Sequence, residues 1–124
     1  MEIVRSDQAP PPVGPYSQAL RFGGLLFVSG QIPLTPEGAL VSGGIEEQTH
    51  QVLRNLKAIL EAGGASLRDV LQTTCYLTDL SEFQRFNDVY AQYFQEPYPA
   101  RVTVGVAALP RGARVEIACI AQAG

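Results

Sequence analysis

Two charged side chains occupy strand-like segments of the sequence, and their types are suited to chemistry. Arg101 opens the segment Arg-Val-Thr-Val-Gly-Val, and Glu116 stands between two β-branched apolar residues. Because side chains alternate between the faces of a strand, Arg101 and Thr103 share one face and the valines take the other. A guanidinium can bind a carboxylate through two parallel N–H donors, and a glutamate can exchange a proton with water. These residue types suit the binding of a small carboxylate and the activation of a water molecule.

Glu116 also has a simpler interpretation. Arg101 and Arg114 both have the charge needed for a cross-strand ion pair with Glu116 on an exposed sheet surface. Such an exposed pair contributes only about 0–1 kcal/mol. The strand pattern alone favours this ion pair over a catalytic role.

Two further polar residues, Asn87 and Tyr16, stand where packing residues are expected. Asn87 falls on the same stripe as three aromatic residues of a helix predicted over 82–94. It is therefore either a hydrogen-bonded core residue or a ligand contact. Tyr16 follows segment 9–15, whose prolines restrict the backbone and hold the tyrosine rigidly. Its ring either packs or lines a site.

Several classes of chemistry do not fit the composition. His50 is the only histidine, which excludes a histidine-rich metal site and a Ser-His-Asp triad, and we expect it at a solvated helix position. Cys75 and Cys119 stand far apart in apolar segments, which indicates free, buried thiols in a reducing compartment. The sequence has no nucleotide-binding glycine motif. We therefore expect no metal and no cofactor.

The overall composition predicts one globular domain over 1–124. Hydrophobic residues make up 46% of the chain and charged residues 17%, which suits a packed core rather than a disordered chain. The net charge is -3 and there is no Lys/Arg cluster, so nucleic-acid binding is not expected. The N-terminus does not resemble a signal peptide and no apolar run is long enough to span a membrane. We expect a cytoplasmic protein.

The apolar pattern predicts an α+β domain. Two short apolar runs flank Gly23-Gly24, which is typical of a β-hairpin. The predicted elements are strands over 19–22, 25–28, 70–77, 101–106 and 114–121, and helices over 45–62 and 82–94. Two helices can cover only one face of a mixed sheet of five or six strands, yet the strands are apolar on both faces. We therefore expect a second copy of the chain to bury the other face.

Four separated segments, taken in order, point to a family. They read Gly-Pro-Tyr-Ser-Gln-Ala at 14–19, Phe-Val-Ser-Gly-Gln-Ile-Pro at 27–33, Tyr-Pro-Ala-Arg at 98–101 and Val-Glu-Ile at 115–117. In this order and spacing they resemble the RidA (YjgF) family of reactive-intermediate deaminases, over nearly the whole chain. The resemblance implies a chorismate-mutase-like fold and a homotrimer whose three sites lie in clefts between subunits.

The resemblance also implies an activity and a site. Enzymes of this family, 2-iminobutanoate/2-iminopropanoate deaminases, hydrolyse 2-aminoacrylate, 2-aminocrotonate and related enamines or imines to 2-keto acids and ammonia. PLP-dependent dehydratases release these substrates. By position, Arg101 matches the arginine that grips the substrate carboxylate, and Glu116 the carboxylate that positions or activates water. The matching pocket-wall residues are Tyr16, Ser29, Gly30, which offers its backbone to the substrate, and Asn87.

Two departures and two rival functions qualify the resemblance. Many relatives carry a cysteine where this chain has Thr103, whose hydroxyl can hydrogen-bond substrate or water but excludes thiolate chemistry. The loop before Tyr98 also looks short. The rival functions are a non-catalytic metabolite-binding regulator, and an RNA-cleaving translation inhibitor or holdase-type chaperone. Glu116 favours an enzyme over a plain carboxylate binder, and the acidic charge argues against RNA.

Overall fold

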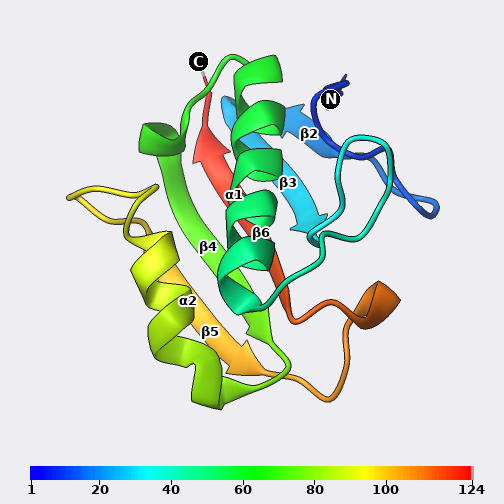
Figure 1. Cartoon of the computed structure of the whole chain (residues 1–124). Helices are drawn as coiled ribbons and strands as arrows, with labels where there is room; N and C mark the ends of the chain where they lie inside the picture. The colour runs from blue at the N-terminus through cyan, green and yellow to red at the C-terminus, as the bar shows by residue number, and fades with distance from the viewer. Residues whose placement is uncertain (124) are drawn as a thin grey trace.

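The computed structural model describes residues 1–123 and contains a six-stranded mixed sheet with two α-helices on one face (Figure 1). The strands are β1 (Glu2–Val4), β2 (Ala19–Phe22), β3 (Leu25–Gln31), β4 (Val70–Leu77), β5 (Ala100–Gly105) and β6 (Val115–Gln122). The helices are α1 (Ile45–Ala62) and α2 (Phe83–Tyr90), and short 3-10 turns cover Leu67–Asp69, Leu80–Glu82 and Pro110–Gly112.

The sheet order is β1-β2-β3-β6-β4-β5, and among the strand pairs of residues 1–123 only β4–β5 is parallel. The predicted hairpin is confirmed as β2–β3, with positive φ at Gly23 and Gly24 in its turn. The three later strands lie within one residue of the predicted bounds. The sequence did not predict β1, which is only three residues long and adds one edge to the sheet.

The first helix matches its predicted bounds because local signals mark both its start and its end. At its N-terminus the Glu47 carboxylate accepts a hydrogen bond of 2.8 Å from Gly44 N. At its C-terminus Gly64 adopts a positive φ of 82°, a conformation that ends a helix readily. The apolar stripe of α1 is fully buried against the sheet.

The second helix is shorter than the pattern predicted. We expected a helix over 82–94, whereas α2 ends at Tyr90 and follows the 3-10 turn Leu80–Glu82, which Asp79 caps. Beyond Tyr90 three-residue backbone hydrogen bonds appear, such as the 3.0 Å bond from Tyr93 N to Tyr90 O. The hydrophobic pattern continued past the last α-helical turn, and so it overestimated the length of the helix.

The core lies between the two helices and one face of the sheet. Alternate residues of the central strand β6 point into it, and each is almost fully buried: Val115, Ile117, Cys119 and Ala121. Phe86 of α2 and the apolar stripe of α1 pack against them. The free, buried state predicted for Cys75 and Cys119 is confirmed.

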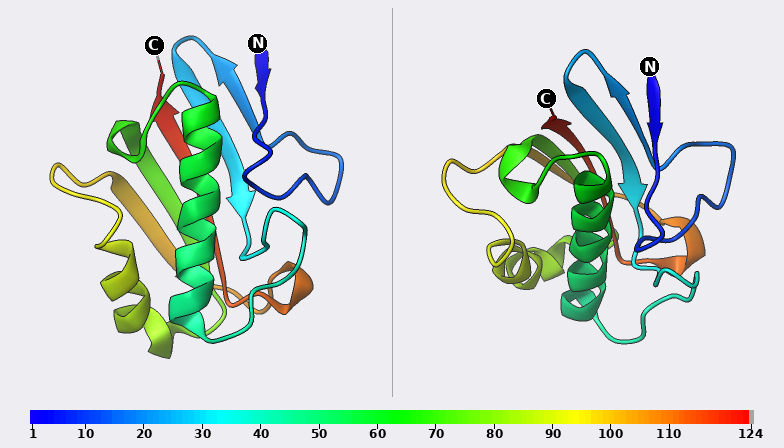
Figure 2. Two further views of the ribbon diagram at one scale, coloured as in Figure 1. Left: turned by 45° about the horizontal axis from the view of Figure 1, so that its top comes forward. Right: turned by 90° about the horizontal axis from the view of Figure 1, so that it is seen from above.

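The opposite face of the sheet, which we call the open face, is covered by neither helix (Figure 2). Large apolar side chains from outer and inner strands remain exposed on it: Ile3, Phe22, Phe27, Val102 and Val104. The predicted alternation in β5, with valines on one face and Arg101 on the other, is thus confirmed. An apolar surface of this kind is typical of an interaction site. Among residues 1–123, no helix has the length and apolar character of a membrane span.

Candidate active site

Arg101 lies on the helix-covered side of the edge strand β5, against a set of aromatic rings from α2. Its Cζ atom is 4.8, 5.5 and 5.7 Å from the ring centroids of Tyr90, Phe83 and Phe86. Its Nη1 donates a hydrogen bond of 2.9 Å to Asn87 Oδ1. Asn87 is therefore not a fully buried core residue. It is half-buried, and its side chain holds the Arg101 guanidinium.

A small pocket of about 320 Å³ opens beside the Arg101 guanidinium, between α2 and the start of β5. It is lined by Asn87, Tyr90, Ala91, Tyr98, Pro99 and Arg101. Thr103 lies two residues beyond Arg101 on the same face, and its Oγ1 atom is buried without a hydrogen-bond partner in residues 1–123. Two of the predicted site residues, Arg101 and Asn87, line this pocket, which we call the arginine pocket, and Thr103 follows Arg101 along the same face of β5.

Glu116 lies in a second pocket, on the open face of the sheet. This pocket, of about 260 Å³, is lined by Val13, Tyr16, Ser29, Gly30, Ile32, Pro110 and Glu116. The carboxylate is half-buried, and burial raises the pKa of Glu116 above its ordinary value. Tyr16, Ser29 and Gly30, the other three predicted site residues, surround it. We call this region the glutamate pocket.

A β-bulge shapes the glutamate pocket. The β3–β6 register shifts between Val28 and Gln31, so Ser29 and Gly30 leave the regular ladder. A Cβ atom on Gly30 would overlap Glu116 Oε2, so the glutamate occupies space that any side chain at position 30 would take. The Gly30 backbone is thus the surface against which the carboxylate rests.

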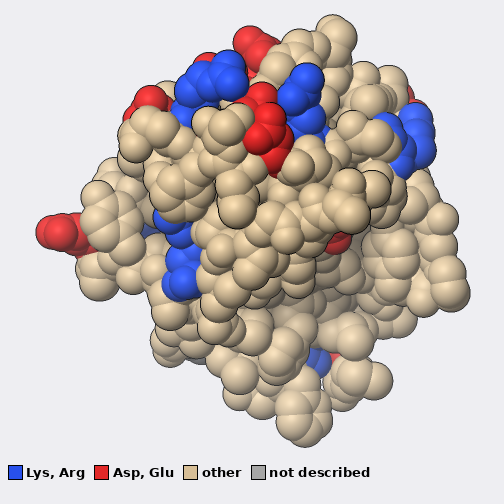
Figure 3. Space-filling model, turned by 90° about the horizontal axis from the view of Figure 1, so that it is seen from below, with Lys and Arg blue, Asp and Glu red and all other residues tan. Residues whose placement is uncertain are grey.

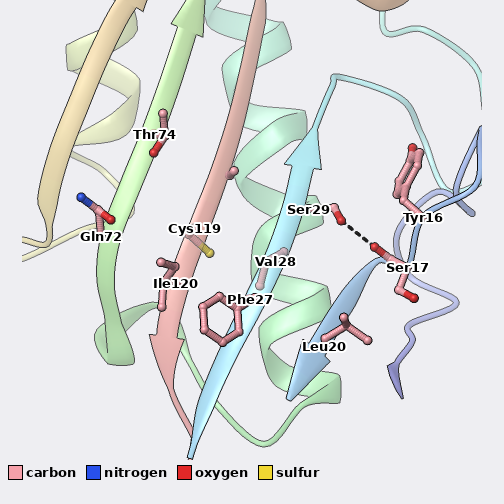
Figure 4. Close-up of a pocket in the computed structure, with 11 residues that line it drawn as sticks. Tyr16, Ser17, Leu20, Phe27, Val28, Ser29, Gln72, Thr74, Cys119 and Ile120 are labelled. Carbon is pink, nitrogen blue, oxygen red and sulfur yellow. Dashed lines mark hydrogen bonds between the residues drawn. The ribbon is translucent and has the colours of Figure 1, made fainter. Parts of the chain in front are cut away.

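The hydroxyls of the glutamate pocket are already engaged. Ser29 Oγ donates a hydrogen bond of 2.6 Å to Ser17 O (Figure 4). Tyr16 Oη accepts a hydrogen bond of 3.2 Å from Val13 N, which ties the tyrosine to its own proline-rich loop as the sequence suggested. Tyr16 remains 45% exposed as a residue, so its side chain lines the pocket instead of packing into the core.

A wider apolar cleft runs along the open face beside the glutamate pocket (Figure 4). Its volume is about 580 Å³, and Phe27, Ile120, Thr74 and Gln72 lie side by side along its floor, with Tyr16 and Leu20 at one end. The cleft and the glutamate pocket share Tyr16 and Ser29.

The arginine and glutamate pockets lie on opposite faces of the sheet. Arg101 is opposite Thr73 in the β4–β5 register, and Thr73 is buried under the helices. Glu116 is opposite Tyr76 in the β4–β6 register. Because Thr73 and Tyr76 are three residues apart on one strand, their side chains point to opposite faces. One chain therefore does not bring Arg101 and Glu116 around one small ligand.

The ion-pair interpretation of Glu116 is wrong. Among the ion pairs of residues 1–123, none includes Glu116 or Arg101. Arg114 pairs instead with Glu82, at 3.1 Å between Nη1 and Oε2. Alternation alone could not reveal this, because the position of Glu82 on the turn before α2 depends on tertiary packing.

The solvated position predicted for His50 is also wrong, and the sequence missed two residues near Arg101. His50 is half-buried, and its Nδ1 shares a hydrogen bond of 2.7 Å with Tyr93 Oη. Tyr90 and Thr73, for which the sequence predicted no role in the site, share a buried hydrogen bond of 2.8 Å behind the guanidinium. The only sequence signal for them was a tyrosine one helical turn after Asn87.

Comparison with known proteins identifies the family. The family model described as Endoribonuclease L-PSP matches residues 6–123. Reactive Intermediate Deaminase A of Arabidopsis thaliana chloroplasts is 50% identical over 121 residues, which cover 97% of this chain and 65% of that protein. The chain belongs to the RidA family.

Solved structures of RidA proteins agree with the fold. RidA from the Antarctic bacterium Psychrobacter sp. PAMC 21119 is 46% identical, with a TM-score of 0.95 and coverage of 98% of this chain and 99% of that one. E. coli TdcF, solved with bound serine, is 38% identical, with a TM-score of 0.94 and full coverage of both chains. The predicted RidA-type mixed sheet with two helices on one face is confirmed.

The two thiols of this RidA chain should be inert in the folded state. Burial raises the pKa of Cys75 to about 11 and that of Cys119 to about 12, and thiolates are the reactive species. We expect no reaction of the native protein with Ellman's reagent at pH 8, and reaction of both thiols in denaturant. The denatured sample is the internal control. Rapid labelling of the native protein would contradict the buried placement.

Proposed function

We propose that this protein hydrolyses reactive enamines and imines, such as 2-aminoacrylate and 2-aminocrotonate, to 2-keto acids and ammonia. The proposed catalyst is a homotrimer in which the arginine pocket of one subunit faces the glutamate pocket of a neighbour. Neither a metal nor a cofactor is required. PLP-dependent dehydratases are the proposed source of substrate, and the cytoplasm, where both thiols stay reduced, is the proposed compartment.

The placement of the two charges supports this proposal most strongly. Arg101 and Glu116 have no ionic partner in residues 1–123, and they stand on opposite faces of one sheet. A half-buried carboxylate without a cation is costly unless it has a function or a partner. The apolar open face next to Glu116 would be buried by a second copy, whose Arg101 lies on an exposed edge strand. Association of copies would thus bury the apolar open face and bring a cation close to Glu116.

The arginine pocket suits the substrate carboxylate. The guanidinium has five N–H donors, of which Asn87 engages one, and the planar fork can bind a carboxylate bidentately. The pocket beside it, of about 320 Å³, matches a small amino-acid-sized ligand. The serine bound to TdcF is a ligand of this size that carries a carboxylate.

The proposed reaction requires only water and one acid–base group. The enamine tautomerises to an imine, and a water molecule attacks the imine carbon. Glu116 accepts a proton from this water and delivers it to the nitrogen, which gives a carbinolamine. Glu116 then accepts the proton of the new hydroxyl group and passes it to the amino group, so that the C–N bond breaks, the keto group forms and ammonia leaves. Burial raises the Glu116 pKa and makes the carboxylate a stronger base, which favours this exchange. A positioned acid–base group of this kind contributes roughly 10²–10⁴-fold to the rate.

The rival functions are less well supported by the geometry. A metabolite-binding regulator needs the arginine pocket but has no use for a desolvated carboxylate. RNA cleavage, which the description of the family model names, would require basic surface for phosphates. The chain carries nine Lys and Arg against twelve Asp and Glu, and on the face in Figure 3 basic side chains are interspersed with acidic ones on a largely uncharged surface.

Replacing Arg101 by lysine tests the carboxylate contact. Lysine keeps the charge but loses the planar fork, and a hydrogen bond to a charged group contributes about 1.5–3 kcal/mol. We expect Arg101→Lys to lower enamine hydrolysis about 10–100-fold, measured as keto-acid release from a threonine or serine dehydratase. Arg54→Lys, on the exposed side of α1, is the matched control. Parental activity of Arg101→Lys would contradict the proposed contact between Arg101 and the substrate carboxylate.

Replacing Glu116 by glutamine tests the proton transfer. Glutamine keeps the size and the hydrogen-bonding reach of the side chain but cannot accept the proton. We expect Glu116→Gln to keep its oligomeric state and its affinity for a 2-keto acid, while turnover falls by roughly 10²-fold or more. Glu61→Gln, an exposed carboxylate on α1, should leave turnover unchanged. Unchanged turnover in Glu116→Gln would show that Glu116 does not transfer the proton.

A further inference from the structure

The Arg101 guanidinium is held by uncharged groups. The rings of Phe83, Phe86 and Tyr90 lie within 5.7 Å of Arg101 Cζ, and Asn87 Oδ1 accepts one N–H. No carboxylate of residues 1–123 pairs with it. Aromatic faces attract a cation without neutralising its charge, so the positive charge stays available to an incoming anion.

The spacing along α2 brings these holding groups to one side. Positions 83, 86, 87 and 90 are separated by three or four residues, so their side chains follow a single stripe along the helix. The stripe meets β5 at Arg101. Of the three rings, the one nearest Arg101 Cζ is that of Tyr90, at 4.8 Å.

Tyr90 differs from the two phenylalanines because its hydroxyl is anchored. Tyr90 Oη shares a buried hydrogen bond of 2.8 Å with Thr73 Oγ1. Thr73 is fully buried on β4, directly opposite Arg101 in the parallel register. The bond therefore fixes the ring by its far end to the strand beside the arginine. Phe94, with its ring centroid 4.5 Å from that of Tyr90, supports the ring from another side.

We propose that Tyr90 is a positioning residue for Arg101: its ring, anchored through Thr73, sets the plane of the guanidinium so that the free N–H donors bind a carboxylate bidentately. The inference rests on the function proposed above. It proposes that the hydroxyl pair of Tyr90 and Thr73, buried behind the guanidinium, contributes to the selectivity of the site for a carboxylate over an uncharged group.

The test measures that selectivity directly. The affinities of the protein for a 2-keto acid and for its uncharged amide are measured by calorimetry in the parent, Tyr90→Phe and Tyr90→Leu. Tyr90→Phe keeps the ring but removes the anchor, so we expect about 2–10-fold weaker binding of the keto acid. Tyr90→Leu removes both the ring and the anchor, so it should weaken keto-acid binding more than Tyr90→Phe does. Binding of the amide should change little in either variant.

Tyr93→Phe is the matched control. It removes another tyrosine hydroxyl from the chain just after α2, with its 2.7 Å hydrogen bond to His50, at a residue that makes no cation–π contact with Arg101. We expect Tyr93→Phe to keep the parental ratio of acid to amide affinity. A purely structural role of Tyr90 would lower thermal stability and leave this ratio unchanged, and that result would overturn the inference.

The outcomes separate the inference from the proposed function. If the parent binds the keto acid and Tyr90→Phe shows the parental ratio, only the role of Tyr90 is overturned. If the parent neither binds a keto acid nor hydrolyses enamines, both are overturned. If Tyr90→Leu does not fold, Tyr90→Phe still decides the question, because it preserves the packing volume of the ring.

Discussion

Successive side chains of a β-strand point to opposite faces of the sheet, and this constraint governs where the polar groups of the protein lie. Arg101 shares its face with the helices, and Glu116 shares its face with the exposed apolar side chains. Glu116 cannot change faces without a shift of register that would also expose the core residues of β6, such as Val115 and Ile117. The parallel register of β5 with β4 places Arg101 on the other face. The separation of the two charges is therefore fixed by the pairing of the strands.

The two faces of the sheet have different consequences for the site. On the covered face, α2 supplies both core packing through Phe86 and the groups that hold Arg101, so the arginine pocket is complete within one chain. On the open face, a bulge at Ser29 and Gly30 and the loop at Tyr16 form a pocket around Glu116 that stays open to an apolar cleft. The proposed association of copies would close this cleft and add the missing cation.

The sequence predicted what depends on local pattern and failed where tertiary geometry decides. Periodicity located α1 and the later strands, and alternation placed Arg101 and Thr103 on one face. Both patterns depend only on residues that are close in the chain. The relation of Arg101 to Glu116 depends on the register of β4 with two other strands, so alternation alone allowed a cross-strand pair that the fold forbids. The anchoring of Tyr90 by Thr73 joins a helix to a strand and left no signal beyond an aromatic residue in a stripe.

Subunit complementation tests most directly whether two chains build each site. Arg101→Lys and Glu116→Gln chains are co-expressed with different tags, and the mixed oligomers are isolated and assayed for keto-acid release. If each site takes its arginine from one subunit and its glutamate from the next, the mixed trimers should recover about a third of the parental activity, because one of the three interfaces in every mixed trimer carries both intact residues. Activity no higher than that of the two single variants would contradict a shared site.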